Sequence, residues 1–107
     1  MIKIRRCCCK RCHNSDIFFN DINKFSKEYS ALVLDVRSKQ EFDEYHINGA
    51  INVPLWSIKN IVPNIVTDFN RYIVVYCTSG VRSKKAQNIL WSMGYRNVFN
   101  VVDGYYW

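Results

Sequence analysis

A single cysteine, Cys77, stands where a strand-like run ends and a helical pattern begins. The run before it, residues 72–76, contains only β-branched and aromatic residues, which is typical of a strand. The first N–H groups of a helix have no partner within it, and a tight loop with a glycine can turn several such groups toward one point. We therefore expect a positive potential at Cys77, which favours the nucleophilic thiolate over the thiol.

An alternative interpretation is that Cys77 only fills space in the core, as unpaired cysteines commonly do. Three neighbours favour the reactive interpretation, because packing alone requires none of them. Gly80 permits a sharp backbone turn, Arg82 adds positive charge, and Ser83 is a candidate cap for the following helix. The sequence therefore predicts that Cys77 is a nucleophile.

The 107 residues are enough for one domain with a core of its own, and 49% of them are hydrophobic. No apolar stretch reaches the length of a membrane span, and the first residues lack the apolar segment of a secretory signal. We therefore expect a cytoplasmic protein without a membrane partner.

The net charge of +6 is concentrated at the start of the chain. The lysines and arginines of residues 1–12 contribute +5, no acidic residue precedes Asp16, and the remainder carries only +1. A basic segment on a nearly neutral domain is weak evidence for a polyanionic partner, since most such segments are simply solvated. We therefore expect no nucleic-acid binding.

Four of the five cysteines crowd the same segment, at Cys7, Cys8, Cys9 and Cys12. The spacing of Cys9 and Cys12 is that of half a zinc site, with His13 as a further ligand, so a metal or redox module is one interpretation. No second ligand pair follows, and a flexible reduced tail is the interpretation we favour. We therefore divide the chain into a basic cysteine-rich tail, residues 1–13, and a domain, residues 14–107, and expect no metal or cofactor.

Hydrophobic periodicity predicts alternating helices and strands after the tail. Glu41 stands three residues after Ser38, which predicts a capping box at the start of a short helix. The expected helices cover residues 14–27, 39–45, a brief segment around 58–62 that ends or kinks near Pro63, and 83–93 before Gly94; the expected strands cover residues 31–36, 50–53, 72–76 and 98–102. This alternation predicts an α/β fold with a mostly parallel sheet, helices on both faces, and a ligand site at the carboxyl ends of the strands.

The motifs resemble those of the single-domain members of the rhodanese family of sulfurtransferases. The first is Asp35-Val36-Arg37 with Glu41-Phe42 and residues 46–54, the second is the loop of residues 77–83, and the third comprises residues 94–98 and 103–107. The resemblance runs from about Ala31 to Trp107, with the motifs in the family's order. It implies the rhodanese-like α/β fold and a catalytic cysteine, here Cys77, that alternates between thiol and persulfide.

By this resemblance Cys77 accepts a sulfane sulfur from a small anionic donor, such as thiosulfate or a persulfide. It then passes that sulfur to a thiol, cyanide or a protein persulfide acceptor, which is covalent catalysis in two half-reactions. Arg82 is expected to attract the anionic donor. The substrate-binding backbone N–H groups are expected to be those of Thr78, Ser79, Gly80, Val81 and Arg82.

We expect four side chains of the first motif to be structural: Asp35, Arg37, Glu41 and His46. Asp35 and Arg37 are close enough to satisfy each other. A positive loop can ionise a thiol without a base, so we interpret His46 as structural as well. Tyr45 stands where the family usually has glycine, and Asp103 stands where a pair of glycines is common. Both departures bear on local loops rather than on the reaction.

Two other functions are open from the sequence. Phosphatases of a related fold have a cysteine followed by five residues and an arginine, whereas only four residues separate Cys77 from Arg82. The shorter loop suits a single sulfur atom better than a tetrahedral phosphate. A non-catalytic domain that binds a partner or senses oxidants is the second alternative, and the physiological donor, the acceptor and the oligomeric state stay open.

Overall fold

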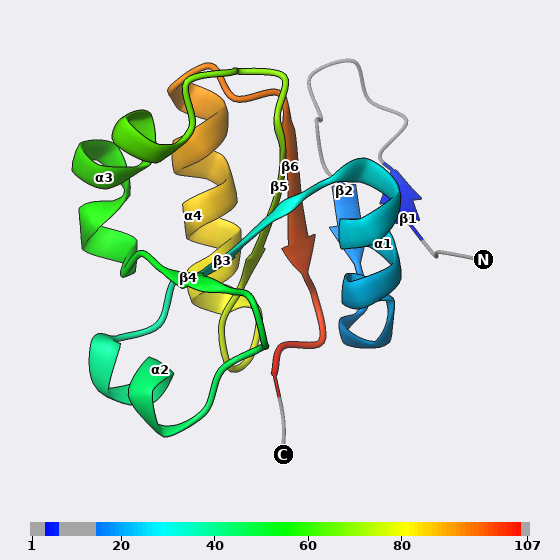
Figure 1. The fold of residues 1–107 in the computed structure, drawn as a ribbon, viewed down its shortest axis with the longest axis vertical. Coiled ribbons are helices and arrows are strands. Elements are labelled where there is room, and N and C mark those ends of the chain that lie inside the picture. Colours follow the sequence, from blue (N-terminus) through cyan, green and yellow to red (C-terminus); the bar gives the residue numbers. More distant parts are fainter. Residues whose placement is uncertain (1–3, 7–14, 106–107) are drawn as a thin grey trace.

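The computed structural model describes residues 4–6 and 15–105, which form an α/β fold with one central sheet (Figure 1). Its elements in chain order are β1 (Ile4–Arg6), β2 (Ser15–Ile17), the 3₁₀ turn η1 (Phe19–Asp21), α1 (Ile22–Tyr29), β3 (Leu32–Asp35), α2 (Lys39–Glu44), β4 (Ile51–Asn52), the 3₁₀ turn η2 (Leu55–Ser57), α3 (Ile58–Ile65), β5 (Tyr72–Tyr76), α4 (Val81–Ser92) and β6 (Asn97–Val101).

The six strands lie in the order β1-β2-β6-β5-β3-β4. Five of them, from β2 to β4, are parallel, and β1 pairs antiparallel with β2. Strand β5 lies between β3 and β6, with Leu34 opposite Val75 on one side and Asn100 opposite Val75 on the other. The predicted parallel α/β fold is confirmed, and the predicted central position of residues 72–76 is confirmed with it.

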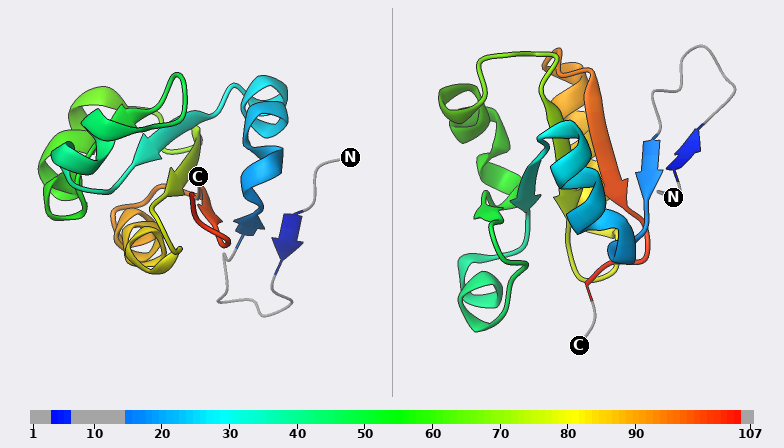
Figure 2. Two further views of the ribbon diagram at one scale, coloured as in Figure 1. Left: turned by 90° about the horizontal axis from the view of Figure 1, so that it is seen from below. Right: turned by 45° about the vertical axis from the view of Figure 1, so that its right-hand side comes forward.

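Helices cover both faces of the sheet, with α1 on one side and α3 and α4 on the other (Figure 2). The side chains of β5 alternate between these two layers, as the strand period of two requires. Ile73 and Val75 belong to the core under α3 and α4, and Val74 and Tyr76 belong to the core under α1. Cys77 continues the alternation on the α4 side, which places its sulfur next to the start of that helix.

The structure confirms most of the predicted elements. The capping box is present, because the Ser38 hydroxyl accepts from the Glu41 amide while the Glu41 carboxylate accepts from the Ser38 amide. Among the boundaries that differ from the prediction, α3 continues through Pro63 to Ile65, and α4 begins two residues earlier than predicted, at Val81.

The predicted helix over residues 14–27 is wrong in its first half. Residues 15–17 form β2, which pairs with β6 through Asp16 and Asn100 and through Ile17 and Val101, and the helix begins only at Ile22. The apolar residues 17, 18, 22 and 25 fit a helical period by chance. Pairing with β6 makes these residues a strand instead, because it completely buries Ile17 in the sheet.

The first residues are partly built into the sheet. Ile4–Arg6 form β1 along the edge of β2, so the predicted flexible tail is wrong for these three residues. The cysteines at positions 7, 8, 9 and 12 and His13 lie outside the described residues, and the division between residues 1–13 and 14–107 stays a prediction. Within residues 4–6 and 15–105, no helix combines the length and apolar character that crossing a membrane demands.

Candidate active site

The loop between β5 and α4 lies at the carboxyl edge of the sheet, at the same end of the molecule as α2 (Figure 1). Cys77 directly follows β5, and Gly80 is the residue before the first turn of α4. Gly80 has a φ of +89°, in the left-handed region that favours glycine. This turn lets α4 begin at Val81, with only residues 77–80 between it and the end of β5, so the first amides of α4 face back toward Cys77.

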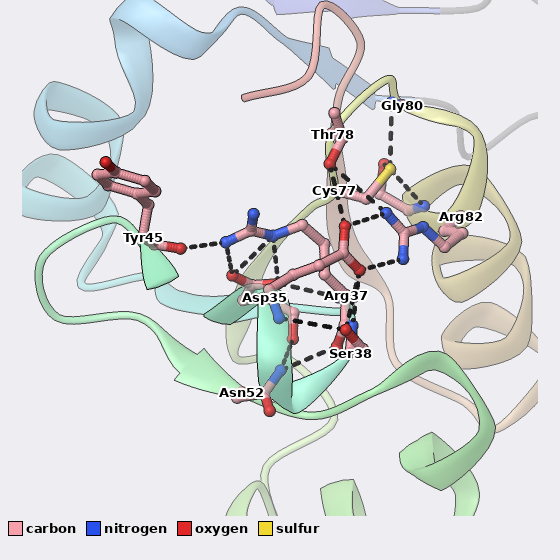
Figure 3. A network of polar contacts seen from close by, with 11 residues as sticks. Asp35, Arg37, Ser38, Tyr45, Asn52, Cys77, Thr78, Gly80 and Arg82 are labelled. Atoms are coloured by element: carbon pink, nitrogen blue, oxygen red, sulfur yellow. Dashed lines mark hydrogen bonds and ion pairs between the residues drawn. The ribbon is translucent and has the colours of Figure 1, made fainter. Parts of the chain in front are cut away.

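Three protein groups surround the sulfur of Cys77, which has no solvent-exposed surface. The Gly80 amide donates to Sγ at 3.1 Å and the Ser83 amide donates to it at 3.4 Å. The Ser83 Oγ lies 3.4 Å from the same sulfur and can donate to it once the thiol is ionised. Figure 3 shows Cys77 pointing toward the backbone of the loop at Gly80. The predicted convergence of backbone amides on Cys77 is therefore present.

Ser83 does not have the predicted role of helix cap. The N-cap position of α4 is Gly80, and Ser83 is the third residue of the helix, with its side chain fully buried. The sequence prediction failed because it started the helix at residue 83. Once the helix starts at Val81, the hydroxyl of Ser83 faces Cys77 and becomes a hydrogen-bonding group for the sulfur.

Two opposing effects act on the Cys77 thiol. Burial disfavours the charged form and raises the pKa, while hydrogen bonds from the Ser83 side chain and from the amides of Ser83, Ser79 and Gly80 lower it. The hydrogen bonds together outweigh the burial, so the pKa of Cys77 is lowered relative to an ordinary thiol. Of the five amides predicted to line the site, those of Ser79 and Gly80 act on the sulfur, and the amide of Ser83 joins them.

The segment after β6 packs directly against this loop. The amide of Tyr105 donates to the carbonyls of Cys77 at 2.9 Å and of Thr78 at 3.1 Å. Two glycines allow this close approach, since a Cβ on Gly80 would lie 2.7 Å from the Val102 carbonyl oxygen and a Cβ on Gly104 would lie 1.9 Å from the Thr78 carbonyl oxygen. The sequence pattern offered no signal for this contact, because the two segments are far apart in the chain.

Arg82 is held by an acidic residue from the other side of the loop. Its Nη1 and Nη2 atoms donate to the two carboxylate oxygens of Glu41 at 2.7 and 3.0 Å. The Thr78 Oγ1 atom lies 3.5 Å from both Arg82 Nη2 and Glu41 Oε2. The prediction treated Glu41 as part of a capping box alone and Arg82 as an attractor of anions. The structure joins the two in one ion pair at the edge of the loop (Figure 3).

The turn that delivers α2 and Glu41 to the loop is fixed by a buried ion pair. Arg37 donates to both carboxylate oxygens of Asp35, and the shortest of these contacts is 2.7 Å. Arg37 also donates to the Tyr45 carbonyl, and its guanidinium lies 5.5 Å from the centre of the Tyr105 ring. Asn52 donates to the carbonyls of Asp35 and Arg37 at 3.0 Å each. These contacts agree with the structural role predicted for Asp35 and Arg37.

His46 and Asp103 are engaged in local contacts. The His46 ring stacks on Phe42 with 3.8 Å between ring centres, and its Nδ1 shares a hydrogen bond of 2.8 Å with the Phe42 carbonyl. Asp103, one of the two departures from the expected motifs, accepts from the Phe19 amide at 2.8 Å and so ties the end of the chain to η1. Within the described ranges, no group of three or more His, Cys, Asp or Glu side chains is arranged to hold a metal ion.

Comparison of the chain with known proteins identifies its family. A family model described as the rhodanese-like domain matches residues 19–107, which include β3, the Cys77 loop and the segment that packs on it. The chain belongs to the rhodanese-like domain family. The resemblance drawn from the motifs is confirmed.

Two curated relatives of this rhodanese-like domain are named for different activities. The thiosulfate sulfurtransferase PspE of Escherichia coli is 40% identical over 67 residues, which are 63% of this chain and 64% of that protein. A tRNA uridine(34) hydroxylase of Hamiltonella defensa is 33% identical over 89 residues, 79% of this chain but only 25% of that protein. The chain thus spans less than two thirds of either relative, and the family includes proteins with different activities.

Solved structures share the rhodanese-like fold. A rhodanese with anions from E. coli has a TM-score of 0.63 and 38% identity, over 65% of this chain and 82% of that one. A human single-domain sulfurtransferase, TSTD1, has a TM-score of 0.73 and 20% identity, over 84% of this chain and 90% of that one.

Proposed function

We propose that this rhodanese-like domain is a sulfurtransferase that carries a sulfane sulfur on Cys77. One observation carries the proposal: the sulfur of an unpaired cysteine receives the Gly80 and Ser83 amides and lies beside the Ser83 hydroxyl, at the carboxyl edge of a parallel sheet. These groups stabilise negative charge on sulfur, both on the thiolate and on a persulfide anion. The relationship to a thiosulfate sulfurtransferase supports the same reaction class.

In the first half-reaction the Cys77 thiolate attacks the outer sulfur of thiosulfate. The new Sγ–S bond forms while the S–S bond of thiosulfate breaks, and sulfite leaves with the bonding electron pair. The enzyme is left with a persulfide anion on Cys77. No proton is transferred, which agrees with a loop that has hydrogen-bond donors but needs no general base such as His46.

In the second half-reaction an acceptor removes the outer sulfur. Cyanide attacks it and leaves as thiocyanate, or a thiolate attacks it and leaves as a persulfide, and in both cases the electron pair of the broken bond returns to Cys77 as thiolate. The Ser83 amide is fixed by the first turn of α4, so this donor to the sulfur keeps its position in both half-reactions.

Access to the sulfur requires movement of the loop. Cys77 has no exposed surface, whereas Ser79 is exposed and Thr78 is half-buried on the outer side of the same loop. A donor therefore reaches Sγ only when residues 78–80 move outward. Complete burial is also the observation that favours the second candidate function, a domain that binds a partner or responds to oxidants without transferring sulfur.

Phosphate-ester hydrolysis is the third function, and the loop length argues against it. Four residues separate Cys77 from Arg82, and the Arg82 guanidinium is already paired in a bidentate manner with Glu41. A phosphatase of the related type would use that guanidinium to hold the phosphoryl oxygens. We therefore expect negligible hydrolysis of aryl phosphates.

Mass spectrometry of one peptide tests the proposal. Trypsin cleaves after Arg71 and Arg82, and the resulting peptide 72–82 contains Cys77 as its only cysteine. Treatment with thiosulfate is expected to add one sulfur, about 32 Da, to this peptide, and cyanide is expected to remove it. A Cys77→Ser variant is the control. If peptide 72–82 gains no sulfur from thiosulfate or from a persulfide, the binding or oxidant-sensing function replaces the proposed one.

A further inference from the structure

The ion pair between Glu41 and Arg82 lies beside the loop and joins two separate elements, α2 and α4. It is bidentate, with both carboxylate oxygens of Glu41 bound to the two terminal nitrogens of Arg82. Both side chains are about one third exposed, at 34% and 37%, so they form part of the surface that a donor meets. Bidentate pairing fixes the orientation of the guanidinium in addition to compensating its charge.

The charges that act on the loop leave it without an excess of cations. Glu41 stays ionised at neutral pH, because the hydrogen bond from Arg82 lowers its pKa to about 2. The opposite charges of Asp35 and Arg37 compensate each other in a buried ion pair. The thiolate of Cys77 adds a further negative charge.

The nearest lysine on α4 is engaged elsewhere. Lys84 donates to Gln87 at 3.1 Å, and its ammonium lies 5.4 Å from the centre of the Trp91 ring. Both partners lie farther along α4, away from the loop. Among the described residues, the hydrogen bonds to the Cys77 sulfur involve backbone amides and the Ser83 hydroxyl, so backbone dipoles contribute the positive potential there.

We infer that Glu41 is a specificity-determining residue, which neutralises Arg82 and so makes the site favour a thiol-bound persulfide over the dianion thiosulfate. This inference rests on the proposed sulfurtransferase function. Thiosulfate brings two negative charges to a loop whose single cation is already compensated by Glu41. A persulfide without further charged groups brings at most one, so it loses less from that compensation.

The preferred first half-reaction then uses a persulfide, RSSH. The Cys77 thiolate attacks the outer sulfur, an Sγ–S bond forms, and the bond between the outer sulfur and the thiol sulfur breaks. The departing sulfur takes the bonding electron pair and the proton of the persulfide and leaves as RSH, while Cys77 keeps the persulfide anion. Arg82 stays paired with Glu41 throughout.

The test compares two donors and two variants. The donors are thiosulfate and 2-hydroxyethyl persulfide, and the readout is the second-order rate at which peptide 72–82 gains one sulfur, without an acceptor. Glu41→Gln removes the charge and keeps an oxygen that can accept from Ser38. Glu44→Gln is the matched control, because Glu44 is an exposed acid on the same helix.

Glu41→Gln is expected to raise the ratio of the thiosulfate rate to the persulfide rate by about two- to sixfold, because one negative charge is removed beside the loop. The gain is expected to shrink in 1 M salt, where the Debye length is about 3 Å. Glu44→Gln is expected to leave the ratio unchanged. A double variant, Glu41→Gln with Arg82→Gln, restores the charge balance and is expected to return the ratio toward that of the parent. Its readout is the tryptic peptide 72–84, because residue 82 is no longer a cleavage site and Lys84 is the next one.

Three outcomes separate the inference from the proposed function. If the parent chain accepts sulfur from neither donor, the proposed function is wrong. If it accepts sulfur and Glu41→Gln changes both rates equally, the ion pair merely restrains the loop and the inference is overturned. If neither rate changes in a folded Glu41→Gln variant, the inference is overturned as well. If that variant does not fold, the double variant and the salt dependence of the parent decide.

Discussion

Substitution of Gly104 by alanine tests whether the segment after β6 supports the active-site loop. An alanine Cβ would lie 1.9 Å from the Thr78 carbonyl oxygen, and real Cβ atoms do not approach closer than 3.0 Å, so one of the two segments must move by at least 1.1 Å. The φ of +70° at Gly104 adds about 1–2 kcal/mol of strain for alanine. Overpacking adds about 1–3 kcal/mol. We therefore expect Gly104→Ala to lower the free energy of unfolding by about 2–5 kcal/mol.

The matched control is Gly49→Ala. Gly49 has a φ of +88°, but no atom lies within 4 Å of the position of its Cβ, so this variant has the strain and lacks the clash. We expect it to lose only about 1–2 kcal/mol, and to show a melting temperature clearly above that of Gly104→Ala. Urea unfolding monitored by circular dichroism measures both variants at one temperature.

The same pair of variants tests the link to catalysis. The carbonyls of Cys77 and Thr78 accept from the Tyr105 amide, so a displaced segment after β6 moves the loop that carries Cys77. A misplacement of about 1 Å costs about a hundredfold in rate in well-organised sites. Sulfur loading of peptide 72–82 should therefore slow strongly in Gly104→Ala and remain near the parent rate in Gly49→Ala. Equal stability or equal loading in the two variants would refute the reasoning.

Three further predictions follow from contacts near the loop. Ser83→Ala removes a hydrogen bond to the sulfur, so the pH midpoint of Cys77 loading should move upward. Loading at neutral pH should slow by at least about tenfold. An unmoved midpoint would contradict the role of this hydroxyl. The pKa of Glu41 is lowered to about 2, so its stabilising contribution is complete above the ordinary pKa of 4.5 and is lost as the pH falls toward 2; acid unfolding of Glu41→Gln should show a smaller loss over this range than the parent. Asp35→Asn leaves Arg37 buried without its counter-charge and should lower the free energy of unfolding by about 3–5 kcal/mol in urea, whereas an equal loss in a variant of an exposed acid, Asp43→Asn, would contradict this explanation.

Local sequence was sufficient for the elements whose partners lie nearby in the chain. The apolar run of residues 72–76 predicts a strand buried on both faces because every residue in it favours a strand, and Ser38 with Glu41 predicts the start of α2 because both halves of the capping box are three residues apart. Cys77 follows from the same logic, since its position is fixed by the strand before it and the glycine after it.

Contacts between distant segments decide what the sequence could not show. Ile17 and Phe18 fit the helical spacing of the apolar residues that follow them, and only pairing with β6 makes residues 15–17 a strand. The partner of Arg82 lies 41 residues away in the sequence, so its compensation by Glu41 could not be seen in the loop motif. The role of Ser83 depends on where α4 begins, and the observed start differs from the predicted one by two residues. Sequence patterns commonly misplace a helix boundary by this much. Here the difference decides whether the Ser83 hydroxyl caps the helix or faces the sulfur.

The chemistry of the loop rests on its backbone more than on its side chains. The alternation along β5 directs Cys77 toward α4, and the amides of Gly80 and Ser83 donate to its sulfur. Glu41 compensates Arg82, so side-chain charge contributes little to the attraction of a donor. Substitutions that keep the path of the main chain should therefore alter which donor is used, while substitutions that displace it, at Gly80 or Gly104, should strongly slow sulfur transfer with every donor.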